Sequence, residues 1–332
     1  MAITYHDLYL KTRMALSSAG IEAAQLEARE ILCAAAEKTA EELYRDISLY
    51  TTDAFAEKTE ALQARRLAGE PIAYLLGEWS FCGLPFFVSP AALIPRVDTE
   101  MLAQLAMNRL KEHPGHTRIL DLCAGTGCVG LTAAALLKNT RAVLVDLSDG
   151  ALDLCKRNIR RHKLTGRAVS LKGDALQAPS HALGQFDVLV CNPPYIPTGD
   201  LAALDTSVKD FEPLLALDGG EDGLDFYRGI TELWQPALKP GGHLLYEVGI
   251  GQAEKVAWLL VKAGYENIRI TRDTGGIDRV VEGQRPKERE IPDMLHETWR
   301  RTCNNGREKE NDGVRGPCRG QEEGTGNRHG AD

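Results

Sequence analysis

The sequence lacks several features that would each define a class of protein. None of its eight cysteines belongs to a C-x-x-C pair, and no compact Cys/His cluster occurs, which argues against a zinc site. No apolar run is long enough to cross a membrane, and the opening MAITYHDLYLKTR is too polar for a signal peptide. Basic residues are in the minority, and a formal charge of −8 disfavours a broad nucleic-acid surface. We therefore expect a reduced, cytoplasmic protein without bound metal.

The first part of the chain has the pattern of a small helical domain. Its 332 residues allow two domains, and residues 1–70 show helical periodicity throughout. Thr51 or Thr52, followed by Asp53, is typical of a helix N-cap. Residues 71–97 alternate proline and glycine with apolar, aromatic pieces, which indicates a linker or β-hairpin.

Residues 98–283 form the larger domain in this interpretation. Apolar segments alternate with helical patterns, which favours a mostly parallel sheet with helices on both faces. The expected strands are residues 118–122, 142–147, 168–172, 186–191, 243–248, 267–271 and 278–282. Residues 284–332 have balanced charge and few large apolar side chains, so we expect this tail to be disordered.

A glycine-rich turn follows the first of these strands. In RILDLCAGTGCVGL, the residues Gly125, Gly127 and Gly130 match G-x-G-x-x-G, and Asp146 ends the next strand. Glycines let the backbone approach a ligand, and a carboxylate can accept from ribose hydroxyls. Asp174, after the third strand, could accept from an adenine amino group. Both aspartates could instead cap helices or turns, and the turn alone does not separate NAD from S-adenosylmethionine.

The segment Asn192-Pro193-Pro194-Tyr195 directly follows the fourth apolar strand. Proline has no N–H and forces the preceding residue into extended geometry, so this turn offers carbonyl oxygens and few donors. Asn192 adds a side-chain oxygen, and Tyr195 adds an apolar face with a polar tip. Such a loop would hold a planar NH2 group and reject a phosphate or carboxylate. The alternative is a rigid loop with a buried tyrosine.

A planar NH2 group, in an amide or on a base, is a poor nucleophile because its lone pair is delocalised. Acceptors that hold both N–H groups orient the nitrogen toward an electrophile and stabilise the positive charge that develops on it. A sulfonium methyl group is an electrophile of the required kind, whereas hydride transfer would not use this loop. The loop therefore favours S-adenosylmethionine over NAD.

These residues resemble the class I S-adenosylmethionine-dependent methyltransferases, in which (D/N)PP(Y/F/W) marks amino-group methylation. The ordered blocks GEPIAYLLG, ILDLCAGTGCVGL, VCNPPYIP, FEPLLALDGGEDGLDFYR and DRVVEG are similar to the HemK-type (PrmC) protein-(glutamine-N5) methyltransferases. The resemblance covers roughly residues 5–283. It implies a Rossmann-like, seven-stranded, mostly parallel sheet with an antiparallel last strand, plus an N-terminal helical domain. It also implies methylation of the glutamine in the Gly-Gly-Gln motif of peptide-chain release factors.

The resemblance further implies a set of site residues. S-adenosylmethionine would contact Cys123, Ala124, Gly125, Thr126, Gly127, Asp146, Asp174, Ala175 and Asn192. The glutamine amide would be held by Asn192 and the carbonyl of Pro193, with Pro194 and Tyr195 beside it. Arg96 would lie near the cofactor or linker, or form a structural salt bridge.

Two positions depart from the family pattern. Cys123 stands where many relatives have glycine, and Ala175 where many have an aromatic residue that could stack on adenine, so we expect somewhat weaker cofactor binding. Two other functions fit part of the pattern. An adenine-N6 methyltransferase acting on nucleic acid would use the same loop, but the acidic charge opposes it. A non-catalytic binding module is opposed by the intact Asn192. We expect a monomer that acts on a release factor.

Overall fold

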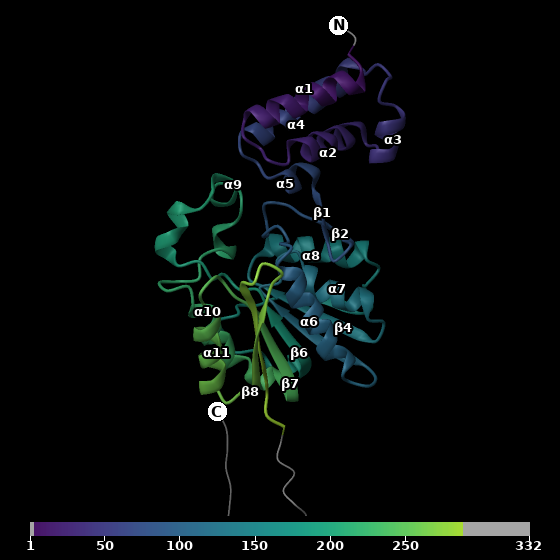
Figure 1. The fold of residues 1–332 in the computed structure, drawn as a ribbon. Helices are drawn as coiled ribbons and strands as arrows, with labels where there is room; N and C mark the ends of the chain where they lie inside the picture. Colours follow the sequence, from purple (N-terminus) through teal and green to yellow (C-terminus); the bar gives the residue numbers. More distant parts are fainter. Residues whose placement is uncertain (1–2, 288–332) are drawn as a thin grey trace, which may run out of the picture. The chain divides into compact units, whose positions relative to one another are not determined.

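The structure is a computed structural model that describes residues 3–287 (Figure 1). The predicted disordered tail lies outside the described residues, apart from residues 284–287. In the described part of the chain, no helix combines the length and apolar character needed to span a bilayer.

The N-terminal part consists of five helices around two small apolar clusters. They are α1 Tyr5–Ser18, α2 Ala24–Ala36, α3 Ala40–Arg45, α4 Asp53–Leu67 and α5 Ile72–Leu76. Thr52 begins α4, because its hydroxyl accepts a hydrogen bond from Phe55 N at 3.2 Å. Thr51 instead donates to Ile3 O. Leu16 and Ile31 are fully buried between the helices.

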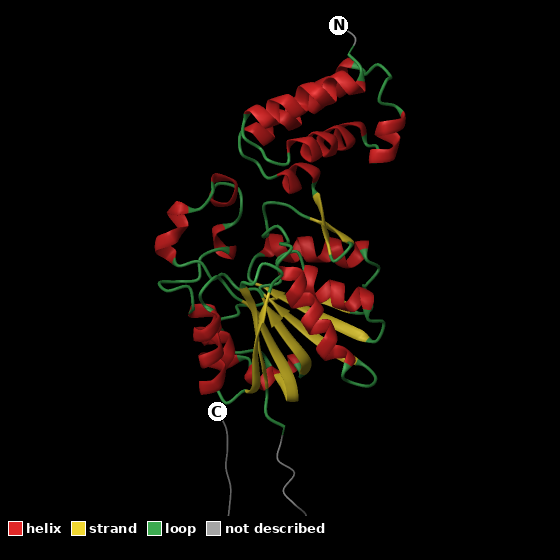
Figure 2. Cartoon of the chain, viewed as in Figure 1, coloured by secondary structure: helices red, strands yellow, loops and turns green. Residues whose placement is uncertain are grey.

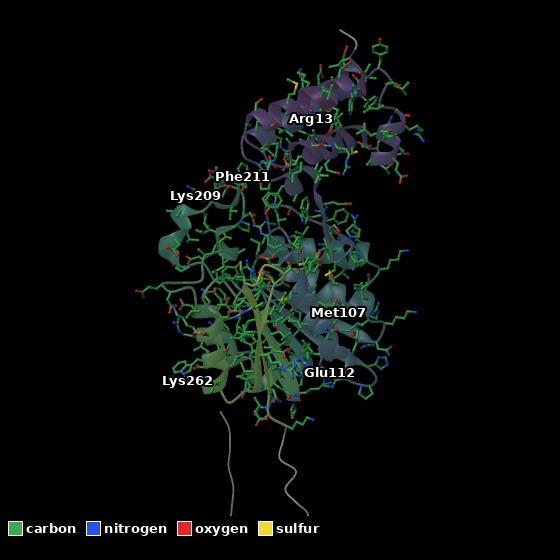
Figure 3. The ribbon with its side chains drawn as sticks, in the orientation of Figure 1. Arg13, Met107, Glu112, Lys209, Phe211 and Lys262 are labelled. Carbon is green, nitrogen blue, oxygen red and sulfur yellow. The ribbon has the colours of Figure 1, made fainter. Side chains whose placement is uncertain are left out.

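A β-hairpin follows the helices. Its strands are β1 Glu78–Phe81 and β2 Leu84–Phe87, which pair in antiparallel register. Cys82 and Gly83 form the turn with φ of 50° and 73°, the combination that suits a two-residue hairpin. Phe211, labelled in Figure 3, packs with Trp79 against a cluster of Ala73, Tyr74, Val88 and Ile94.

The larger sheet is the main group of yellow strands in Figure 2. It has seven strands in the order β5-β4-β3-β6-β7-β9-β8. These strands are β3 Thr117–Leu122, β4 Thr140–Asp146, β5 Ala168–Lys172, β6 Phe186–Cys191, β7 Leu238–Glu247, β8 Glu266–Arg272 and β9 Asp278–Gln284. The strands β3 to β7 pair in parallel, and β9 runs antiparallel to both of its neighbours. The predicted fold class is confirmed.

Helices cover both faces of this sheet. The main ones are α6 Thr99–Lys111, α7 Cys128–Leu136, α8 Asp149–Arg161, α10 Asp225–Leu233 and α11 Ala253–Lys262; α9 Thr206–Lys209 is short. Alternate strand residues enter two separate cores. Ile119 and Val190 pack with α6 and α7, whereas Leu120 and Leu189 pack with α10 and α11.

One strand differs from its prediction by more than two residues. We expected residues 243–248, but β7 begins at Leu238, before a Pro-Gly-Gly segment that is typical of a turn. The register shifts here, since Phe186 lies opposite Leu238 and Val188 opposite His243. Gly242 permits the irregularity, because a Cβ there would lie 2.9 Å from Lys239 O.

Gly130 lets helix α7 lie close to the sheet, and replacing it tests this packing. A Cβ at Gly130 would lie 2.6 Å from Leu144 Cδ2 and 3.1 Å from Asp121 Cβ. We expect Gly130→Ala to lower the free energy of unfolding by about 1–3 kcal/mol, because both neighbours are buried and must move. Urea denaturation measures the change.

Gly166→Ala is the matched control, because a Cβ at Gly166 would meet no atom within 4 Å and its φ is not positive. It should change the free energy of unfolding by less than about 0.5 kcal/mol. Equal stability of the two variants would contradict the account of the packing of α7.

Candidate active site

A cavity of about 290 Å³ lies at the carboxyl ends of the parallel strands. It is lined by residues that follow four adjacent strands: Cys123 after β3, Asp146 at the end of β4, Gly173 after β5 and Asn192 after β6. Residues 91–96 and the segment 213–216 complete the wall. Parallel α/β sheets bind ligands at this edge, because the loops after neighbouring strands converge there.

Nine of the predicted site residues line this cavity. They are Cys123, Ala124, Gly125, Thr126, Asp146, Asp174, Ala175, Asn192 and Pro194. Gly127 does not line the cavity, because it begins α7 and packs against the sheet. A Cβ added at this position would lie 2.9 Å from Leu144 Cδ1. Pro193 and Tyr195 also lie outside the lining.

The glycine turn is held in place by Asp146. Its Oδ2 accepts from Gly125 N at 2.8 Å and its Oδ1 accepts from Ser148 N at 2.9 Å. The predicted alternative of a helix cap is not realised, because Ser148 caps α8. Cys123 takes a φ of 55°, a left-handed conformation that glycine would adopt without steric cost. The departure from the family pattern therefore strains the backbone at this position.

Asp174 also takes part in a turn. Its Oδ1 accepts from Leu176 N at 2.8 Å, and no helix begins there. Ala175 next to it is buried, and its carbonyl accepts from the indole of Trp234 at 2.8 Å. The nearby Phe226 of α10 lines the cavity and was not predicted from the sequence. The cavity wall therefore does contain an aromatic side chain, but Phe226 supplies it and the position of Ala175 does not.

The Asn-Pro-Pro-Tyr loop leaves three oxygen acceptors without partners. Within residues 3–287, no hydrogen bond reaches the carbonyl oxygens of Pro193 and Pro194, or Oδ1 of Asn192. Asn192 Nδ2 donates to Thr99 Oγ1 at 3.3 Å, so the donor end of this amide is occupied. Pro193 and Pro194 are buried, and Tyr195 is half-buried. The loop therefore offers acceptors and withholds donors.

The segment 217–223 holds this loop in position. Ile196 N donates to Leu217 O at 3.0 Å, and Gly219 N donates to Ile196 O at 2.8 Å. A Cβ at Gly223 would lie 2.3 Å from Tyr195 O, which only glycine avoids. Gln252 Nε2 donates to the same Tyr195 oxygen at 2.9 Å. Gly223 of the DGGEDG block is thus needed for the close approach of this segment to the loop backbone.

Arg96 forms a salt bridge, as one of the two sequence interpretations proposed. Its Nη2 lies 2.5 Å from Oε1 of Glu212, whose side chain is buried. Arg96 also lines the cavity. Its charge is therefore compensated by Glu212.

Comparison with known proteins identifies the family. Residues 7–77 match the family described as PrmC N-terminal domain, and residues 96–210 match the methyltransferase small domain. A "Release factor glutamine methyltransferase" of Geobacter sulfurreducens is 42% identical over 82% of this chain and 94% of that protein. A protein of the same name from Moorella thermoacetica is 39% identical over 80% and 92%. This chain belongs to the release factor glutamine methyltransferase family.

A solved structure agrees on the fold. The hMettl16 catalytic domain in complex with MAT2A 3'UTR hairpin 6 superposes with a TM-score of 0.52 at 15% identity. The match covers 70% of this chain and 84% of that chain. The prediction of an S-adenosylmethionine-dependent methyltransferase is confirmed by the family matches.

The charges around the cavity suit this cofactor, whose sulfonium and ammonium groups outweigh its one carboxylate and leave it with a net positive charge. Asp121, Asp146 and Asp174 line the cavity, and the cation among its lining residues, Arg96, is already paired. Sequence reasoning missed Asp121, which is the acidic residue within the apolar strand ILDL. Its Oδ2 accepts from Gly130 N at 2.8 Å. A cationic ligand would compensate these carboxylates.

The ionisation of Asp121 gives a testable pH dependence. Burial raises the pKa of Asp121 from 3.8 to about 8; the negative charge of Asp146 adds to this increase, and the Gly130 N–H opposes it. The folded state therefore binds the proton more tightly than the unfolded state, so stability is lost as pH rises through this range. In Asp121→Asn this loss is absent, and the amide oxygen can still accept from Gly130.

Urea denaturation without cofactor, between about pH 5 and pH 8, measures this difference. Relative to the variant, the wild-type protein should lose at least about 1 kcal/mol of unfolding free energy across this range. Glu247 titrates in the same window, but it is present in both proteins and its contribution cancels. Parallel pH profiles for the two proteins would show that Asp121 does not titrate as described.

Proposed function

We propose that this protein methylates N5 of the glutamine in the Gly-Gly-Gln motif of peptide-chain release factors. The observation that carries the proposal is the unpaired set of acceptors at Asn192, Pro193 and Pro194, next to a cavity lined with carboxylates. Relatives that match about four fifths of the chain bear the name release factor glutamine methyltransferase, which supports this substrate.

Residues around the cavity would hold the cofactor. We assign S-adenosylmethionine to the turn Cys123–Gly127, with Asp146 for the ribose, Asp174 and Ala175 near the adenine, and Asn192 at the reactive end. Gly127 would act indirectly, by allowing α7 to begin against the sheet. When bound, S-adenosylmethionine supplies the methyl group that the amide nitrogen takes in exchange for a proton.

The loop would orient the glutamine amide. Asn192 Oδ1 and the Pro193 carbonyl each accept one N–H of the amide, while Pro194 and Tyr195 confine its plane. Fixing both hydrogens aims the nitrogen lone pair and places negative dipoles where positive charge develops. Tyr195 would stay neutral, because burial raises its pKa to about 12. No general base is required, since the proton becomes acidic only as the nitrogen is alkylated.

We also propose how the rest of the chain contributes. Residues 1–70 would bind the body of the release factor, residues 71–97 would act as the linker, and residues 98–283 would carry out catalysis. The match of residues 7–77 to a domain defined in this family supports the first assignment. The enzyme would act as a monomer in the cytoplasm, without binding nucleic acid directly.

Transfer to a release factor tests the function itself. The protein is incubated with S-adenosylmethionine labelled in its methyl group and a bacterial release factor. We expect one labelled site, and none in a factor whose Gly-Gly-Gln glutamine is changed to alanine. Labelling of both factors alike would contradict the proposal. Labelling of DNA or RNA instead would favour adenine-N6 methylation, which presents a similar planar pair of donors.

Replacement of Asn192 tests the role of the loop. Asn192→Ala removes one acceptor of the amide, and we expect kcat to fall by at least about 100-fold, the scale of one well-placed polar group. Binding of S-adenosylmethionine, measured by calorimetry, should change far less. Asn108→Ala is the control, because Asn108 is exposed on α6 and does not line the cavity. Unchanged turnover in Asn192→Ala would require another account of the loop.

A further inference from the structure

Glu247 is a buried carboxylate next to the Asn-Pro-Pro-Tyr loop that the proposed mechanism does not use. It ends β7, and its residue is only 2% exposed. The parallel strands β6 and β7 pair with Cys191 opposite Tyr246. The next residues along each strand, Asn192 and Glu247, are therefore neighbours on the same side of the sheet. Thr99, the first residue of α6, lies on that side and accepts from Asn192 Nδ2.

The burial of this carboxylate calls for an explanation. Its Oε2 has no hydrogen-bond partner within residues 3–287. Burial raises the pKa of Glu247 to about 7, and the Thr99 hydroxyl and the Asn192 amide, both of which face it, act in the opposite direction. A buried carboxylate with one unsatisfied oxygen and no cationic partner costs folding free energy, so it is retained where another benefit offsets that cost.

A second buried glutamate in the same sheet provides a contrast. Glu282 of β9 is 3% exposed, but Arg109 Nε donates to its Oε2 at 3.1 Å. Arg269 lies 3.8 Å from its other oxygen. Glu282 is thus a structural ion pair, whereas no Lys or Arg within the described residues forms a salt bridge with Glu247.

We propose that Glu247 is a positioning residue for methyl transfer. Together with Thr99, it holds the Asn192 amide with Nδ2 toward the interior and Oδ1 toward the cavity, and its negative charge polarises that amide. The inference rests on the proposed function, because it concerns the acceptor that the glutamine amide would meet.

The orientation matters because the two ends of an asparagine amide have opposite hydrogen-bonding character. If the Asn192 amide were rotated by half a turn, its NH2 would face the NH2 of the substrate, and two donors would meet. Thr99 alone does not prevent this rotation, since a hydroxyl both donates and accepts. A carboxylate only accepts, so it selects the Nδ2 end. Its charge also strengthens Oδ1 as an acceptor for a nitrogen that becomes positive.

Several other charged or titratable groups influence this carboxylate. Asp98, at the start of α6, raises its pKa and Arg279 of β9 lowers it. The charge of Glu247 in turn raises the pKa of Tyr195, Cys128 and Tyr227. Each of these three groups is neutral near pH 7, because burial raises its pKa above the ordinary value. Glu247 is therefore the group in this set that changes charge near neutral pH.

Glu247→Gln, compared with Glu282→Gln, tests the inference on the full chain with a release factor as substrate. For Glu247→Gln we expect kcat to fall by about 10–100-fold, with the KM for the release factor within about twofold of wild type. Its urea denaturation midpoint should be unchanged or higher, because a buried unpaired charge is removed. Glu282→Gln should show the reverse: a lower midpoint and an unchanged kcat.

The pH profile separates positioning by charge from a purely structural role. Wild-type kcat should rise between about pH 6 and pH 8 as Glu247 ionises, and this rise should be smaller in Glu247→Gln, in which Asp121 still titrates in the same range. Thr99→Val, which removes the hydroxyl but keeps the shape, should also lower kcat and keep the rise. This variant carries the test if Glu247→Gln does not fold.

Two outcomes would overturn the inference, and they are distinguishable. A wild-type enzyme that methylates the release factor, together with a Glu247→Gln variant of equal kcat and equal pH profile, would refute the role of Glu247 alone. A wild-type enzyme that transfers no methyl group to the release factor would refute the proposed function and this inference with it.

Discussion

The site depends on a turn that has acceptors but almost no donors. Two adjacent prolines after β6 remove two N–H groups, and the carbonyl oxygens of Pro193 and Pro194 then accept no hydrogen bond within the described chain. Much of the surrounding structure supports this arrangement. Segment 217–223 pairs with the loop backbone, and Gln252 holds the carbonyl of Tyr195. A ligand with two N–H groups in one plane would satisfy what the protein leaves unsatisfied.

Buried carboxylates are the second feature of the site. Burial raises the pKa of Asp121 and of Glu247, which means that folding places both where ionisation is costly. In the reaction that we propose, one is assigned to each of the two reactants. Asp121 lines the cavity assigned to a cationic cofactor, and Glu247 lies behind the asparagine assigned to the substrate amide. The buried carboxylates lower the stability of the ligand-free protein, and binding of a positively charged ligand restores that stability.

The sequence predicted the fold well because its signals are local. Six of the seven sheet strands begin and end within two residues of their predicted bounds, since alternation and glycine turns mark them. The prediction for β7 was less accurate because Pro240-Gly241-Gly242 is typical of a turn but lies inside a bulged strand. Asp121, Thr99, Glu247 and Phe226 were missed. Their roles depend on the register of distant segments, which brings Asp121, Thr99 and Phe226 to the cavity and places Glu247 beside Asn192.

The most direct test of the account is a crystal structure with S-adenosylhomocysteine and a release-factor peptide that contains the Gly-Gly-Gln loop. The account predicts that the glutamine side-chain nitrogen lies about 3 Å from Asn192 Oδ1 and from the carbonyl of Pro193, with Asn192 Nδ2 still on Thr99. A glutamine amide bound elsewhere would contradict it, as would an Asn192 amide whose NH2 faces the substrate.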